Sequence, residues 1–182
     1  RLIKKKICNW RIINYEIRNT KKNIRFNKEI GNQDNLYTLL TKAKTRKNLT
    51  IINSINKFFL NKKKNFEYIE KKIHNGTLSL ITITITENGY FKDDGNFNLK
   101  NKFISYDIKN NNHKFQTIYG MLFLILKNCI KANKKITVIS CDNIENNSES
   151  LKDCLKIFCD KKDRNVGKRI NKHLIFCNSM VD

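Results

Sequence analysis

Residues that could carry chemistry are few in this chain, and their spacing matches no catalytic motif. The three histidines, His74, His113 and His173, lie far apart in the sequence. The chain contains neither G-x-x-x-x-G-K-[ST] nor G-x-G-x-x-G, so no glycine-rich phosphate loop is predicted, and Gly89 and Gly95 are interpreted as turn glycines. We therefore expect no catalytic residue and no cofactor.

The six cysteines show no metal-binding spacing. They include no C-x-x-C pair, and the closest pair, Cys154 and Cys159, has no histidine near it in the sequence. Most of the cysteines have apolar neighbours and are interpreted as small core side chains. A disulfide framework is not expected in a basic chain of this size without a secretory signal. No metal site is predicted, although a zinc site assembled over long range stays open.

The charge of the chain is strongly positive and unevenly distributed. Its formal net charge is +21, and residues 1–72 hold 20 basic against 5 acidic side chains. A positive electrostatic field attracts polyanions, and the phosphate backbone of a nucleic acid is the natural candidate for a binding partner. The abundance of Lys, Asn and Ile also fits mutational pressure in an A/T-rich genome. The charge thus favours an RNA partner without identifying it.

The N-terminal part is predicted to be a basic extension that is partly helical. Residues 1–35 interleave basic residues with Trp10, Tyr15 and Phe26, which is typical of an arm lying on RNA. A solvated tail, rich in Lys through codon usage, is the alternative. In residues 36–72 the spacing of leucines, isoleucines and Phe59 predicts two amphipathic helices.

Alternation and turn residues predict two strands in the middle of the chain. Residues 78–86 alternate apolar side chains with Thr almost throughout, which indicates a strand. Asn88-Gly89 indicates a hairpin turn, and residues 102–108 are interpreted as the next strand. The longest apolar run is far shorter than the roughly 20 residues of a membrane span, so no span is expected.

The C-terminal part has the clearest pattern. Residues 114–132 show the spacing of a buried helix, 135–140 form a short apolar strand, and a second helix begins at Ser148. Residues 161–172 are interpreted as a basic loop and 173–177 as a final strand. This order predicts an α/β fold with a mixed β-sheet and helices packed on it.

The order of local motifs resembles that of the eleventh protein of the bacterial-type small ribosomal subunit. His74-Asn75-Gly76-Thr77 is similar to that family's Asn-Asn-Thr, and residues 83–89 are similar to its Thr-Ile-Thr-Asp-x-x-Gly. Residues 112–115 precede the long helix where the family has a basic stretch, and 147–151 resemble its Gly-Arg-Glu-Ser-Ala. The resemblance covers residues 71–177 and implies two domains, a basic extension over 1–70 and an α/β RNA-binding domain over 71–182.

This resemblance implies a structural, non-enzymatic constituent of a mitochondrial small ribosomal subunit, located in the mitochondrial matrix. The protein would lie on the platform near the mRNA exit side, in contact with small-subunit rRNA and neighbouring ribosomal proteins, with mRNA near the exit as a further candidate. Lys and Arg would bind phosphates, while Asn, Thr and His would bind sugars and base edges. The expected RNA-binding residues are Lys71, Lys72, Asn75, Thr77, Lys109, Asn112, His113, Lys114, Lys161, Lys162, Arg164, Lys168, Arg169 and Lys172.

The same order also resembles the ribonuclease H-like group, which implies a degenerate or active metal-dependent nuclease. Such an enzyme needs several carboxylates around two metal ions. Asp142 follows a strand at a suitable place, but residues 78–86 offer only threonines before Glu87, and the long helix begins without an acid. The ribosomal role is therefore preferred, with an organellar ribosomal protein that has no close counterpart as a third alternative.

Overall fold

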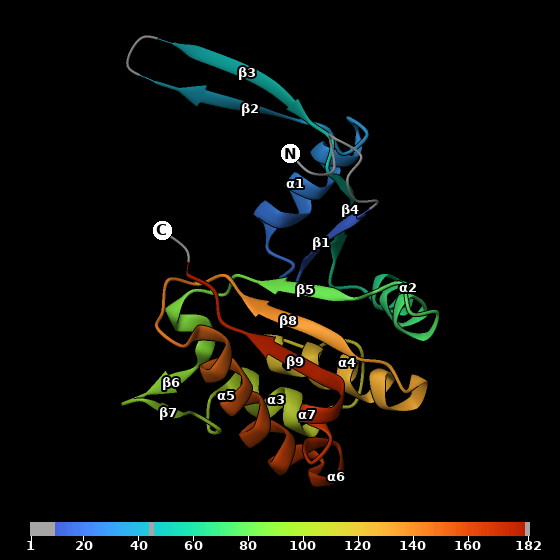
Figure 1. The fold of residues 1–182 in the computed structure, drawn as a ribbon, viewed down its shortest axis with the longest axis vertical. Coiled ribbons are helices and arrows are strands. Elements are labelled where there is room, and N and C mark those ends of the chain that lie inside the picture. Colours follow the sequence, from blue (N-terminus) through green and yellow to red (C-terminus); the bar gives the residue numbers. More distant parts are fainter. Residues whose placement is uncertain (1–9, 44–45, 181–182) are drawn as a thin grey trace. The chain divides into compact units, whose positions relative to one another are not determined.

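The computed structural model describes residues 10–43 and 46–180 and divides into two compact units, Arg1–Lys62 and Lys63–Asp182. Figure 1 shows the helices and strands of both units. The domain boundary predicted after residue 70 falls inside helix α2 (Lys63–His74). Across the described residues, no helix is both long enough and apolar enough to cross a membrane.

The first unit consists mainly of strands. Its elements are β1 (Ile12–Glu16), α1 (Lys21–Gly31), β2 (Tyr37–Lys42), β3 (Lys47–Ile52) and β4 (Ile55–Leu60). β1 pairs in parallel with β4, and α1 packs on β4, where the rings of Phe26 and Phe58 lie 5.6 Å apart and Asn27 donates a hydrogen bond to the Phe58 carbonyl at 2.7 Å. The basic extension predicted from the sequence is thus an ordered αβ unit over its described residues.

β2 and β3 form an antiparallel hairpin, drawn as two long arrows in Figure 1. Cross-strand pairs such as Leu40 with Leu49 and Tyr37 with Ile52 match the β-propensity of this Thr- and Ile-rich segment. The prediction of two amphipathic helices over residues 36–72 is therefore wrong, since only α2 is helical there. The leucine spacing suggested helices because apolar side chains lie exposed on both faces of the hairpin. The sequence therefore lacks the alternation of apolar and polar residues that usually indicates a strand.

The second unit is a parallel α/β layer structure. Its elements after α2 are β5 (Leu80–Ile83), the 3₁₀ helix η1 (Glu87–Tyr90), β6 (Lys92–Asp93), β7 (Asn96–Phe97), α3 (Lys102–Lys109), α4 (Ile118–Ala132), β8 (Ile136–Ser140), α5 (Asn147–Lys162), α6 (Arg164–Gly167), α7 (Ile170–His173) and β9 (Leu174–Cys177). The strands run in the order β5-β8-β9, and both neighbouring pairs are parallel (Figure 1).

α4 is the central helix of this unit. Leu122, Ile125 and Leu126 are fully buried, and most other residues of the helix are buried as well, except in its last turn and a half. The helix begins where the Thr117 hydroxyl accepts from the Gly120 amide, and it ends at Asn133 in the left-handed conformation. The long buried helix predicted from residues 114–132 is confirmed, as are the strands and the helix predicted after it.

The α/β class with helices packed on a sheet is confirmed, whereas a mixed sheet with a ribosomal or ribonuclease H-like core is wrong. Helical crossovers join β5 to β8 and β8 to β9, which is the connection that parallel strands require. Residues 102–108, predicted as a strand, form α3 because Asn101 caps the helix and Ile104 and Asp107 share its buried face. Asn88-Gly89 lies in η1 and forms no hairpin turn.

Candidate functional site

The carboxyl ends of three parallel strands meet at one edge of the sheet. β5 is followed by Thr84 and Ile85, β8 by Cys141 and Asp142, and β9 by Asn178. In open α/β sheets, ligands bind outside this edge because the loops there converge from several strands. The polar residues that follow the strands are therefore the candidate site.

Asp142 connects the end of β8 to the end of β5. Its carboxylate accepts hydrogen bonds from the backbone amides of Ile85 and Thr86, both at 3.0 Å. The other carboxylate oxygen lies 3.1 Å from the hydroxyls of Tyr90 and Ser140. The side chain is only 4% exposed, and these donors stabilise its charge where water is excluded.

Tyr90 is held beneath this edge. Its hydroxyl lies 2.8 Å from the Ser140 hydroxyl, and its carbonyl accepts from Tyr119 at 3.1 Å. Burial raises the pKa of Tyr90 to about 12, and the neighbouring charge of Asp142 acts in the same direction. Tyr90 is therefore a neutral hydroxyl at physiological pH and works as a structural donor.

The backbone is strained at the start of this loop. Thr86 has φ 58° and ψ 167°, a conformation that is sparsely populated by residues other than glycine. Strain of this kind persists only where surrounding contacts hold it, and here the Asp142 carboxylate binds the amide of Thr86 itself.

A second polar network joins the end of β9 to the beginning of α5. The Asn178 side-chain oxygen accepts from the amides of Ser148 and Glu149 at 3.0 and 3.2 Å. The Ser148 hydroxyl donates to the Cys177 carbonyl at 2.6 Å, and Asn147 donates to the carbonyls of Asp142 and Ser179. The amides of Ser148 and Glu149 in the first turn of α5 are thus satisfied by Asn178 and are not left for a phosphate.

A hollow of about 540 Å³ lies beside this edge, a volume within the range of small-molecule sites. It is lined by Asn88, Tyr90, Phe91, Lys92, Asp93, Gly95, Asn101, Ile144 and Ser150. The Lys92 ammonium donates to the Ser150 hydroxyl at 2.6 Å, which joins the β6–β7 hairpin to α5. The lining contains a basic and an acidic side chain, two side-chain amides and two aromatic rings, so it suits a polar ligand.

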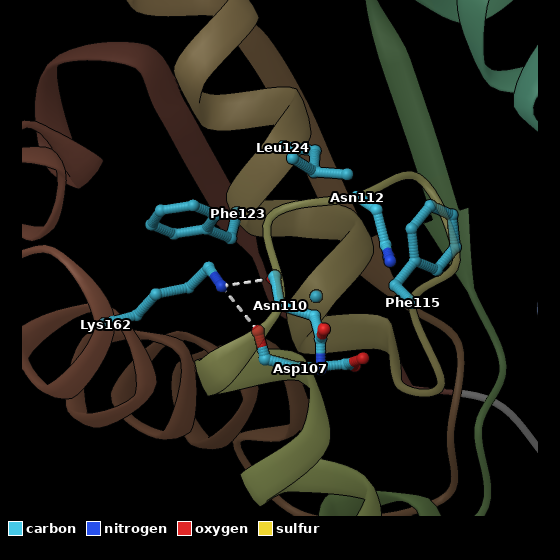
Figure 2. A pocket seen from close by; sticks show the side chains of 8 residues that line it. Asp107, Asn110, Asn112, Phe115, Phe123, Leu124 and Lys162 are labelled. Carbon is cyan, nitrogen blue, oxygen red and sulfur yellow. Dashed lines mark hydrogen bonds between the residues drawn. The ribbon is translucent and has the colours of Figure 1, made fainter.

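A second cavity, shown in Figure 2, is structural. Its volume of about 10 Å³ is enough for one water at most. The Lys162 ammonium donates to the carbonyls of Asp107, Ile108 and Asn110 at 2.5, 2.9 and 2.6 Å, and two of these bonds are drawn in Figure 2. Lys162 therefore satisfies the last carbonyls of α3. Its pKa is lowered by burial, against the opposing effect of Asp107.

The fourteen residues expected to bind RNA do not gather at the carboxyl edge. The Asn75 side chain accepts from the amide and hydroxyl of Thr77, and the His113 ring packs 5.4 Å from the ring of Phe66. Asn112 and Lys162 line the small cavity of Figure 2. The remaining nine are Lys71 and Lys72 at the end of α2, Lys109 at the end of α3, Lys114 before α4, Lys161 in α5, and Arg164, Lys168, Arg169 and Lys172 in or beside α6 and α7.

Several site residues were missed at the level of sequence, namely Tyr90, Ser140, Asn147, Ser148 and Asn178. The available signal was the polar run that directly follows β8 and the Asn-Ser pair that follows β9. No cluster of three or more His, Cys, Asp or Glu able to hold a metal occurs in residues 10–43 or 46–180. The carboxylates that a two-metal nuclease needs are therefore not assembled in that part of the chain.

The model of the mannitol dehydrogenase Rossmann domain matches residues 3–182. The chain belongs to this family. Mannitol 2-dehydrogenase from Aspergillus oryzae is 29% identical over 157 residues, which cover 84% of this chain and 31% of that protein. The enzyme of the same name from Pyricularia oryzae is 27% identical over the same shares. The chain spans about a third of the length of these relatives.

Two solved structures share the fold of this Rossmann-domain family member. D-sorbitol dehydrogenase in its substrate-free form matches with a TM-score of 0.84 and 26% identity, over 95% of this chain and 36% of that one. Pseudomonas fluorescens mannitol 2-dehydrogenase, in a ternary complex with NAD and D-mannitol, matches with a TM-score of 0.80 over 92% of this chain and 34% of that one. At 24% identity, the second match shows the fold alone.

The family match overturns the ribosomal interpretation. The resemblance to the eleventh small-subunit protein, the structural role on the ribosomal platform, and the contacts with rRNA, ribosomal proteins and mRNA are all wrong. The nuclease alternative and the expectation of a non-enzyme are also wrong, because the relatives are oxidoreductases. The mitochondrial location rested on the ribosomal resemblance and stays a prediction.

The residues present fit a dinucleotide only in part. The connection between β1 and α1, Ile17-Arg18-Asn19-Thr20, contains no glycine, and the Thr20 hydroxyl accepts from the Asn23 amide. The glycine-rich turn that lets a backbone approach the pyrophosphate is therefore not offered there. The polar carboxyl edge and its hollow do fit the hydroxyl and amide groups of a nucleoside. The carboxyl edge of β5, β8 and β9 thus suits the sugar and amide groups of a dinucleotide, whereas the β1–α1 connection does not offer a glycine-rich phosphate loop.

Proposed function

We propose that this chain forms part of the NAD-binding domain of a polyol dehydrogenase that acts on a sugar alcohol of the mannitol type. The family match over residues 3–182 carries the proposal. It is supported by the D-sorbitol dehydrogenase fold and by the placement of polar loops at the carboxyl edge of β5, β8 and β9.

In this function NAD supplies the hydride chemistry, and the protein binds and orients the reacting groups. The edge residues are suited to binding and orientation, because the side chains of Asn88 and Asn143 are exposed there. The buried members of the edge, Tyr90 and Asp142, have their polar groups bonded within the protein. The exposed asparagines are therefore the candidates for contact with ligand hydroxyls and amides.

The positive charge of the chain is compatible with this function. NAD carries a pyrophosphate, and a protein of net charge +21 attracts anions over a long range. The charge that favoured RNA is therefore also compatible with a dinucleotide. This explains why charge alone did not distinguish the two ligands.

Titration of the full chain with NADH, followed by the change in NADH fluorescence, tests the proposal. We expect saturable binding with a dissociation constant below about 1 mM, since dehydrogenases work within the usual KM range. A single-stranded RNA oligonucleotide serves as the comparison at 0.15 M salt, where nonspecific phosphate binding is weakened. RNA binding without any NADH binding would overturn the proposal.

A further inference from the structure

Asp142 is a buried carboxylate whose hydrogen bonds all go to the framework of the edge. It accepts from two backbone amides of the segment after β5 and from two hydroxyls, and it is 4% exposed. Its own carbonyl accepts from the Asn147 side chain at 2.8 Å. One residue thus joins β8, the segment after β5 and the beginning of α5.

The segment that Asp142 holds has little freedom to rearrange. Gly89 lies so close to Ile85 that a Cβ on Gly89 would stand 2.9 Å from the Ile85 Cβ. The Gly89 amide also donates to the Thr86 carbonyl at 2.9 Å, which closes the turn. Thr86 remains at a positive φ within this turn, so release of its amide would let the backbone relax to a different path.

This segment forms a wall of the 540 Å³ hollow. Asn88, Tyr90 and Phe91 lie on that wall, and each follows Thr86 within five residues. Tyr90 is bound to Asp142 directly, while Asn88 and Phe91 are placed by the turn that begins at Thr86. A change in the path of the backbone at Thr86 would therefore move the wall.

We propose that Asp142 is a positioning residue: its carboxylate fixes residues 84–91 in the strained path that shapes the ligand hollow at the carboxyl edge. Asp142 does not touch the ligand, since its two oxygens are engaged by four protein groups and the side chain is buried. The identity of the ligand as NAD or polyol rests on the proposed function, whereas the control of the segment by Asp142 does not.

A matched control is available in Asp107. This carboxylate is 3% exposed and also accepts from two backbone amides, those of Gln116 and Thr117 at 2.8 Å, and from the Thr117 hydroxyl at 2.7 Å. It lies between α3 and α4 beside the small cavity of Figure 2. Loss of either carboxylate removes a similar set of hydrogen bonds to backbone amides and hydroxyls, but only Asp142 binds residues 84–91.

Hydrogen exchange of the full-length chain, read by peptide mass spectrometry over residues 84–91, tests this role directly. Asp142→Ala leaves two amides without acceptors, and we expect exchange in this segment to rise at least about tenfold. Asp142→Asn keeps an oxygen for the amides, and the hydroxyls of Tyr90 and Ser140 rotate to accept from its amide group, so exchange should stay within about threefold of wild type. Asp107→Ala should leave this segment unchanged.

NADH titration of the same variants gives the functional readout. We expect Asp142→Ala to weaken NADH binding at least about tenfold, or about 1.4 kcal/mol, because residues 84–91 would no longer hold the wall of the hollow in the shape that the ligand needs. Asp142→Asn and Asp107→Ala should retain wild-type affinity within about threefold.

The two readouts separate the role of Asp142 from the proposed function. Unchanged exchange over residues 84–91 in Asp142→Ala would overturn the inference, whatever binds to the hollow. Raised exchange with unchanged NADH affinity would also overturn it, because the segment would then not shape the ligand site. If Asp142→Ala does not fold, Asp142→Asn decides the matter. A change of tenfold or more in its exchange over residues 84–91, or in its NADH affinity, would contradict the role of residue 142 as a hydrogen-bond acceptor for the amides of Ile85 and Thr86. If wild-type chain bound no NADH, the proposed function would fail, and the exchange result alone would decide whether Asp142 holds the segment.

Discussion

The hydroxyl groups of Tyr90 and Ser140 lie 2.8 Å apart, and both are 3.1 Å from the same carboxylate oxygen of Asp142. Three polar side chains, one from η1 and two from the end of β8, thus share one buried contact. Because water does not reach this contact, a missing member leaves the others without a substitute.

Tyr90→Phe removes one hydroxyl from this contact and keeps the ring. We expect a loss of about 1.5–3 kcal/mol in the free energy of unfolding, the usual contribution of a hydrogen bond to a charged group. Urea denaturation measures it. Tyr106→Phe, at a more exposed tyrosine on α3, is the control and should change stability by less than about 0.5 kcal/mol. Equal stability of the two variants would contradict the role given to Tyr90.

Lys162→Met removes the ammonium that binds the three carbonyls at the end of α3 and keeps most of the apolar side chain. We expect a loss of about 1–3 kcal/mol, because the partly buried carbonyls lose the donor that Lys162 provides. Thermal and urea unfolding measure it. The neighbouring Lys161 is exposed, so Lys161→Met should stay within about 0.5 kcal/mol of wild type. A loss as large in Lys161→Met would show a general charge effect.

Gly120→Ala tests the close approach between α4 and α3. A Cβ on Gly120 would stand 2.5 Å from the Asp107 carboxylate oxygen and 2.8 Å from the Phe115 Cβ. We expect destabilisation of about 2–3 kcal/mol through overpacking. Gly31→Ala, at the end of α1 with nothing within 4 Å, is the control and should be neutral or slightly stabilising. Chemical denaturation of the two variants should therefore give changes of opposite sign or very different size.

The buried thiols of Cys129 and Cys159 predict a loss of stability at high pH. Burial raises the pKa of each thiol from 9.0 to about 12. Between these values the unfolded thiols lose protons that the folded thiols keep, so the free energy of unfolding falls as pH rises from about 9 to 12. Urea denaturation at pH 8 and pH 10.5 measures the fall.

The double variant Cys129→Ala/Cys159→Ala should show a smaller fall between these two pH values than wild type. Cys177 is exposed, so Cys177→Ala should keep the wild-type slope. A slope that is the same in all three proteins would show that other groups, such as the buried tyrosines, account for the whole effect.

The sequence was sufficient to predict the helices and strands that are buried on one face or on all sides. The run of apolar side chains in α4 and the short apolar runs of β8 and β9 have few alternative interpretations. The β2–β3 hairpin was missed because Leu39, Leu49 and Ile51 remain about half exposed or more, and so no buried face imposes a period on the sequence.

The candidate site was harder to predict because its contacts join distant parts of the chain. Asp142 was recognised as an acid that follows a strand, but its interpretation as a nuclease ligand was wrong. Its actual partners, Ile85 and Thr86, lie 57 and 56 residues away and become neighbours only through the parallel register of β5 and β8. Short motifs in an Asn-, Lys- and Ile-rich chain also matched a ribosomal family by composition, which the comparison over residues 3–182 corrects.

We propose that the carboxyl edge of β5, β8 and β9 binds NAD. Hydrogen exchange of the full chain, with and without saturating NADH, tests it most directly. We expect slower exchange in residues 84–91, 141–147 and 178–180, the segments that follow the three strands. Unchanged exchange in these segments at a saturating NADH concentration, or protection confined to other segments, would contradict it.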